Sequence, residues 1–253
     1  GFACAAKHFP GNGQDFRDAH LSNNVNYFDV EEWDKTYGLV YKTLIENDLD
    51  AIMVGHIMLP KYAKAINPDL KDEDMMPATL SPEIMKGLLR DKLGFNGMVV
   101  TDASHMVGMT DRMKRKDMLP RTINAGCDMF LFFNDPEEDF ATMLEAYQNG
   151  IISEERMEEA LERILGLKAH LGLHKKAKEE LVPAPEALEG VLGSQEHKDM
   201  QKAISRDSIT LVKYKDKEVL PVVPERYKRI MIVHVKGAES GMSALAKAMG
   251  MAG

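Results

Sequence analysis

The chain contains only two cysteines among its 253 residues, Cys4 and Cys127, and neither has a CxxC partner. A disulfide scaffold is not indicated, and no zinc pattern such as HxH or HExxH is present. Both cysteines lie inside apolar runs, which predicts two buried thiols. No GxGxxG follows any apolar run, so nucleotide binding has no support. We therefore expect a protein that uses no metal ion and no other cofactor.

Long apolar runs and excess positive charge are missing as well. No run approaches the roughly 18 residues that a membrane-spanning helix needs, and no signal peptide is visible. The net charge of −8 argues against a nucleic-acid partner. A short basic cluster at 112–116 lies between Asp111 and Asp117, which indicates a solvated loop. The oligomeric state stays open, as does the compartment, cytoplasmic or secreted.

The chain does show a repeated order of strand, loop and helix. Each of four apolar runs is short and nearly continuous, as in a parallel sheet that is covered on both sides. We predict strands at 2–6, 51–57, 98–102 and 127–133. We predict helices at 30–49, from Pro82 onward after a Ser81 cap, and at 118–125, 136–149 and 153–171, with a polar loop at 60–77.

Polar side chains stand at the C-terminal end of each predicted strand. Lys7 and His8 follow the first strand, His56 ends the second, Asp102 ends the third, and Asn134 follows the fourth. Four such units make half of a (β/α)8 barrel, in which the reactive face lies at the strand C-termini. A doubly wound open sheet is the alternative on the pattern alone. The predicted fold class is therefore α/β, with binding and chemistry at this edge of the sheet.

The composition of the chain changes after the last predicted helix. Lysines, glutamates and two prolines mark a linker at 175–203, after a first domain at 1–174. Two β-rich runs at 208–213 and 229–235, then a helix from about 240, predict that 204–253 begin a second α/β domain. Because the chain starts in a strand and stops in a helix, we expect it to be a piece of a longer protein.

Two groups of residues are candidates for chemistry. Asp102 ends a strand, where rigid backbone suits a carboxylate nucleophile, although an aspartate there could also cap the following loop. Asp18 and His20 form a D-x-H pair on the loop after the first strand. Such a pair can work as a carboxylate–imidazole dyad that gives and takes a proton near neutral pH. A two-residue motif also arises by chance, and a lone histidine such as His56 or His105 is more often structural.

Five stretches together resemble glycoside hydrolase family 3, and most closely its β-N-acetylglucosaminidase branch. The resemblance covers about residues 1–172 in the family's order. The stretches are KHFPGxG at 7–13 with Asp18-x-His20, MVGHI at 53–57, PATLSP at 77–82, LLRxxLGFxG at 88–97, and VVTD at 99–102. The resemblance places the first of them at strand five of a (β/α)8 barrel. It implies the C-terminal half of that barrel, followed by the start of an α/β sandwich domain.

The resemblance also implies roles for individual residues. Asp102 matches the family's catalytic nucleophile, His20 the acid/base and Asp18 its dyad partner. Lys7 and His8 match residues that hold the sugar, and His56 is expected near the same subsite. The chain departs from the family's pattern at Asn12 and Gln14, where a histidine and an aspartate are common. Neither departure falls on a catalytic position.

The implied activity is retaining hydrolysis of β-linked N-acetylglucosamine through a covalent glycosyl-enzyme, with a carbohydrate as the only expected partner. The nearest alternatives are a β-glucosidase or β-xylosidase of the family, with a carboxylate acid/base in a later domain, and a glycoside phosphorylase. A non-catalytic fragment is the alternative from another class. Half a barrel exposes a sheet edge and an open core, so we expect residues 1–253 alone to be unstable and inactive.

Overall fold

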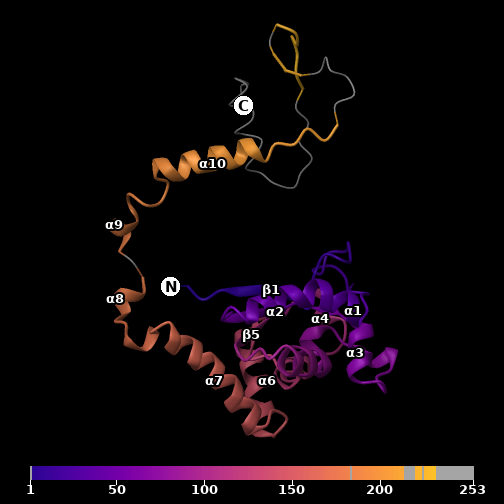
Figure 1. Cartoon of the computed structure of the whole chain (residues 1–253). Coiled ribbons are helices and arrows are strands. Elements are labelled where there is room, and N and C mark those ends of the chain that lie inside the picture. Colours follow the sequence, from indigo (N-terminus) through magenta and orange to yellow (C-terminus); the bar gives the residue numbers. More distant parts are fainter. Residues whose placement is uncertain (1, 183, 214–219, 224, 232–253) are drawn as a thin grey trace. The chain divides into compact units, whose positions relative to one another are not determined.

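The computed structural model describes residues 2–182, 184–213, 220–223 and 225–231. The chain divides into two compact units, Gly1–Pro183 and Ala184–Gly253. Figure 1 shows the order of the elements along the chain. The larger unit contains the sheet and every predicted site residue, and it is described first.

A four-stranded parallel sheet forms the centre of the first unit. Its strands lie in the order β1 (Ala5–Phe9), β3 (Ala51–Val54), β5 (Met98–Ala103) and β6 (Met129–Leu131). The α/β class with parallel strands is thereby confirmed. The first strand lies three residues later than predicted at both ends, so it includes Lys7 and His8, and the second and fourth strands are shorter than predicted. A small second sheet pairs β2 (Asn24–Val25) with β4 (Ile57–Met58), also in parallel.

The helices largely follow the predicted pattern, with one error. Asp29 caps the first helix by accepting the N–H of Glu32, whose side chain accepts the N–H of Asp29 in return. The region 60–77 was predicted to be loop, but it opens with a helix whose Tyr62 is buried. Its Pro60 sits at the first helical turn, where proline is tolerated. The helical elements of this unit are α1 (Val30–Trp33), η1 (Asp34–Gly38), α2 (Leu39–Ile45), α3 (Pro60–Ile66), η2 (Asp72–Asp74), η3 (Ala78–Leu80), η4 (Glu83–Lys92), α4 (Val107–Thr110), α5 (Arg115–Ala125), α6 (Pro136–Gln148), α7 (Glu154–His170), η5 (Leu173–Lys175) and α8 (Lys178–Leu181).

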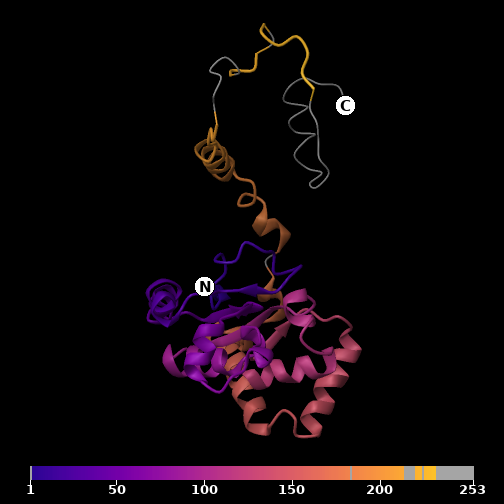
Figure 2. The same ribbon diagram turned by 90° about the vertical axis from the view of Figure 1, so that its right-hand side faces the viewer.

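The two faces of the sheet differ in how well they are covered. Most helices gather on one side of the sheet (Figure 2). Ile52 and Val99, which lie opposite each other in register, are fully buried on that side. The neighbouring positions in register, Lys7, Met53, Val100 and Met129, share the other face and are all exposed or half-exposed. Asp102 lies two residues beyond Val100, so it belongs to this open face as well.

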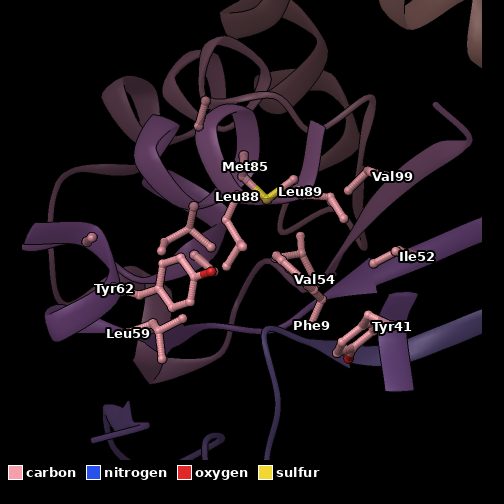
Figure 3. Close-up of a cluster of buried hydrophobic side chains, with 14 of the residues drawn as sticks. Phe9, Tyr41, Ile52, Val54, Leu59, Tyr62, Met85, Leu88, Leu89 and Val99 are labelled. Atoms are coloured by element: carbon pink, nitrogen blue, oxygen red, sulfur yellow. The ribbon is translucent and has the colours of Figure 1, made fainter. Parts of the chain in front are cut away.

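Aromatic and aliphatic side chains fill the space between the sheet and its helices (Figure 3). Phe9 at the end of β1 makes edge-on contacts with Trp33 and Tyr41, and Trp33 contacts Tyr62 in the same way. The indole N–H of Trp33 donates to the carbonyl oxygen of Pro10 at 2.7 Å. The core therefore fixes the point at which the chain leaves β1 for the loop of the predicted dyad.

The cysteine prediction was correct for one residue and wrong for the other. Cys127 is fully buried, and burial raises the pKa of its thiol well above the usual range. Cys4 is exposed, although it lies in an apolar run. The reason is its position immediately before β1, which has only one neighbouring strand in the sheet.

A buried charge cluster links the N-terminal ends of β5 and β6 to the helices. The carboxylate of Asp128 is fully buried and accepts the backbone N–H of Val99 at 2.9 Å. It also pairs with three arginines from η4 and α7, namely Arg90, Arg156 and Arg163. These bonds lie near the N-terminal end of β5, whereas Asp102 lies near its C-terminal end.

The second unit contains two helices within its described residues, α9 (Pro185–Leu188) and α10 (Gln195–Asp207). The predicted linker at 175–203 therefore contains short helices and most of α10. The run at 208–213, predicted to be a strand, forms a turn and irregular backbone. The predicted helix from about 240 lies outside the described residues, as does most of the run at 229–235. Among the described residues, no helix has both the length and the apolar character needed to cross a membrane.

Candidate active site

An irregularity at the end of β1 brings His8 to the open face. Lys7 pairs with Met53 on β3, whereas Phe9 pairs with Val54, the very next residue. His8 is thus an extra residue in β1, and such an insertion re-aims a side chain. The peptide bond between Lys7 and His8 is cis, as is the bond before Pro10.

Asp102 is held at the end of β5 by its own neighbours. Its Oδ1 accepts the N–H of Ala103 at 2.8 Å, and its backbone carbonyl accepts the hydroxyl proton of Thr101 at 2.6 Å. The Oδ2 atom lies 3.3 Å from Nε2 of His8, and the two side chains are 20% and 26% exposed. A carboxylate oxygen is therefore fixed in direction while remaining accessible from the open face.

Partial burial is the main reason why the His8 ring is neutral around physiological pH. Partial burial lowers the pKa of His8, and the charges of Lys7 and His20 lower it further, against the opposing effect of Asp102. A neutral ring carries a single N–H. It can donate a hydrogen bond to Asp102 or to a sugar hydroxyl without neutralising the carboxylate charge.

The predicted dyad is formed. Nδ1 of His20 lies 2.7 Å from Oδ1 of Asp18, and the same oxygen accepts the backbone N–H of His20 at 2.9 Å. These two hydrogen bonds, the backbone one foremost, lower the pKa of Asp18, so its carboxylate stays charged. Both side chains are more than half exposed. With Nδ1 engaged, Nε2 is the ring nitrogen of His20 that is open to a substrate.

Polar contacts fold the dyad loop and anchor it beside β5. Asp15 binds the side chain of Arg17 and also accepts the N–H of Val25 at 3.0 Å. The side-chain amide of Asn23 donates to Asp111, which ends α4. The N–H of Val107 in α4 donates to the carbonyl of His20 at 3.4 Å. The loop therefore rests on the segment that directly follows Asp102.

The surroundings of His56 differ from those predicted for a residue near the sugar. Its side chain is 1% exposed, and both ring nitrogens are used inside the protein. Nδ1 lies 3.0 Å from the hydroxyl of Thr79, and Nε2 lies 3.0 Å from the carbonyl oxygen of Ala103. A direct contact of this ring with a sugar is not supported by that placement.

The structure thus brings His8 and Asp102 together on the open face, beside a loop that carries Asp18 and His20. Lys7 is exposed on the same face, whereas His56 is buried. Sequence reasoning missed the contacts from Thr79 and Val107, which contact these residues only through the fold. Within the described part of the chain, no group of three or more His, Cys, Asp or Glu side chains could hold a metal ion.

Comparisons with known proteins show which proteins the chain is similar to. The chain is 44% identical to the "Beta-N-acetylglucosaminidase/beta-glucosidase" of Cellulomonas fimi over 248 residues, which cover 98% of the chain and 43% of that protein. The solved structure of a beta-glucoside phosphorylase, BglX with bound 2FGlc, superposes with a TM-score of 0.81 at 43% identity, over 88% of this chain and 39% of that one.

A further solved structure is a family 3 β-N-acetylglucosaminidase from Paenibacillus sp., with a TM-score of 0.70 at 28% identity, over 85% of this chain and 39% of that one. The chain therefore spans less than half the length of these relatives. The model of the glycosyl hydrolase family 3 N-terminal domain matches residues 1–167, and the chain belongs to that family.

Proposed function

We propose that this chain carries the reacting groups of a retaining glycosidase that removes β-linked N-acetylglucosamine. One observation carries the proposal: the Asp102 carboxylate at the end of β5 faces His8 at 3.3 Å, beside the loop that holds the Asp18–His20 dyad. The names of the Cellulomonas and Paenibacillus relatives support the sugar.

The first step is the attack of an Asp102 oxygen on the anomeric carbon. The new bond to Asp102 forms while the bond to the leaving oxygen breaks, and protonated His20 gives that oxygen its proton through Nε2. The developing imidazole stays oriented by Asp18. Retaining glycosidases usually employ two carboxylates for these roles, and here the dyad stands in for one of them.

The second step releases the sugar. Neutral His20 takes a proton from a water molecule, whose oxygen attacks the anomeric carbon and displaces the Asp102 carboxylate. Both groups return to their starting states, so no further reactant is needed. Lys7 and His8, on the open face beside Asp102, are proposed to bind hydroxyl groups of the sugar in both steps.

Phosphorolysis is a second candidate, and one observation favours it. The relative with a TM-score of 0.81 is called a beta-glucoside phosphorylase. In that reaction a phosphate oxygen replaces the water oxygen, and the product is a sugar 1-phosphate. An imidazole repels an approaching phosphate less than a carboxylate does, so the dyad suits either acceptor.

We further propose that the four strands are half of an eight-stranded barrel and that 204–253 begin a second domain. The share of each relative that the chain covers supports this reading. Activity is therefore to be measured in the full-length protein, which supplies the other strands.

The test is an assay of the full-length protein with aryl N-acetylglucosaminide and aryl glucoside, with and without phosphate. Free N-acetylglucosamine as the main product supports the hydrolase, whereas sugar 1-phosphate formed only with phosphate supports the phosphorylase. Asp102→Ala is expected to lower kcat by a factor on the order of 10⁴ or more, as removal of a covalent nucleophile does. Unchanged turnover in Asp102→Ala would reject both candidates.

A further inference from the structure

We propose that His56 is a positioning residue, which aims the Asp102 carboxylate by holding Ala103, the residue that follows it. The inference rests on the proposed function, because it concerns the group that attacks the sugar. In this proposal His56 contacts protein groups of the site and does not contact the sugar.

The hydrogen bonds around Ala103 carry the proposal. The N–H of Ala103 donates to Oδ1 of Asp102 at 2.8 Å, so the direction of the carboxylate depends on the Ala103 peptide. The carbonyl of the same residue accepts from His56 at 3.0 Å. His56 therefore holds one end of a residue whose other end holds the nucleophile.

The hydrogen-bond partners determine the state of the His56 ring. A carbonyl oxygen only accepts, so Nε2 must carry the proton that bonds to Ala103. Burial lowers the pKa of His56 and keeps the ring neutral, which leaves Nδ1 as an acceptor for the hydroxyl of Thr79. The ring is thus fixed from both sides, by η3 and by β5.

Close packing gives the ring little freedom to move. Thr79 is fully buried, and Gly108 of α4 lies against the His56 backbone. A Cβ atom on Gly108 would lie only 3.1 Å from Cβ of His56 and 3.2 Å from its carbonyl oxygen. With its Cβ and carbonyl packed against Gly108 and its ring bonded on both sides, His56 has little room to move away from Ala103.

The experiment compares two amide substitutions in the full-length enzyme. In His56→Gln, the amide N–H can reach the carbonyl of Ala103, as Nε2–H does. In His56→Asn, the shorter amide can replace Nδ1 toward Thr79 but leaves Ala103 unbonded. Thr122→Val is the matched control, because Thr122 is also fully buried and its hydroxyl bonds only within its own helix, to Met118.

We expect His56→Asn to lower kcat about 100-fold with KM within about threefold of wild type, because a small misplacement of a reacting group has that effect. His56→Gln should retain kcat to within about tenfold. Thr122→Val should lower the melting temperature and leave kcat unchanged. The test does not include His56→Ala. Its outcome therefore does not depend on a variant that fails to fold.

Three results would overturn the proposal. A raised KM with unchanged kcat in both amide variants would mean that His56 binds the sugar. Equal losses of kcat in the Gln and Asn variants would mean that the bond to Ala103 is unimportant. A loss of kcat of similar size in Thr122→Val would lead to the same conclusion. Wild-type enzyme that turns over no glycoside would instead reject the proposed function itself, and with it this role.

Discussion

Oδ1 of Asp18 accepts two hydrogen bonds from His20, one from the ring at 2.7 Å and one from the backbone at 2.9 Å. The ring is thereby fixed relative to its own main chain, so the loop moves the dyad as a unit. The orientation of the proton-carrying nitrogen does not depend on neighbouring elements, although the location of the dyad does.

Asp18→Asn is expected to lower kcat by about 10²–10⁴, the usual contribution of a positioned acid/base group. The amide keeps the shape of the side chain but loses the charge that stabilises the imidazolium. Steady-state kinetics with an aryl N-acetylglucosaminide in the full-length enzyme measure the effect. Asp29→Asn, at a helix cap far along the loop, serves as the control and should leave kcat unchanged. A kcat of Asp18→Asn within twofold of wild type would contradict the dyad.

Asp111→Ala is expected to release the dyad loop from α4. A hydrogen bond to a charged group contributes about 1.5–3 kcal/mol, and its loss should lower kcat about tenfold by reducing the docked population. Hydrogen exchange should become faster at 11–23. Asp117→Ala, at an exposed residue in the first turn of α5, is the control. Unchanged exchange in the loop of Asp111→Ala would show that Asn23 does not anchor it.

Gly108→Ala and Gly166→Ala should change stability in opposite directions. A Cβ atom at 108 would contact His56 and lie 3.4 Å from the carbonyl of Ala19, so we expect a loss of about 1–3 kcal/mol of unfolding free energy. A Cβ atom at 166 meets no heavy atom within 4 Å inside helix α7, and alanine is favoured there by up to about 1 kcal/mol. Chemical denaturation of the full-length protein measures both. A stabilised Gly108→Ala would show that α4 is packed less tightly than described.

Asp139→Asn should weaken the protein at neutral pH and flatten its response to acid. The hydrogen bonds from Arg115 lower the pKa of Asp139, so the pair stabilises the fold above the ordinary carboxyl pKa, near pH 4. That contribution is lost as the pH falls below 4 through the lowered pKa. We expect a loss of about 3 kcal/mol at pH 7, as for other broken buried pairs.

Melting temperatures of wild type and Asp139→Asn between pH 7 and pH 3 provide the measurement. The gap between the two proteins should narrow as the pH falls below 4. A constant gap over the whole range would mean that the charge of Asp139 does not contribute.

Much of this arrangement follows from local pattern, and the rest depends on distant partners. Asp102 could be placed at a strand end because an apolar run precedes it, and the dyad because its two members are neighbours in the chain. The helix at Pro60–Ile66 was missed since it buries only two side chains, Tyr62 and Ala63. Cys4 was misjudged because composition says nothing about which strand lies at an edge.

The hydrogen bonds of His56 could not be predicted for a similar reason. Its partners stand 23 and 47 residues away in the chain, and the link from Asn23 to Asp111 spans 88 residues. No periodicity or motif encodes such pairings. They appear only when the sheet has placed the ends of β3 and β5 side by side.

The proposed nucleophile, Asp102, and the proposed proton carrier, His20, depend on two unrelated kinds of support. Asp102 belongs to a strand that the apolar core holds in place, whereas His20 belongs to a loop held by a few polar bonds to α4. Substitutions in that loop can accumulate without cost to the sheet. Under the proposed function, substitutions in this loop can therefore change the acceptor, water or phosphate, while the Asp102 carboxylate keeps its position.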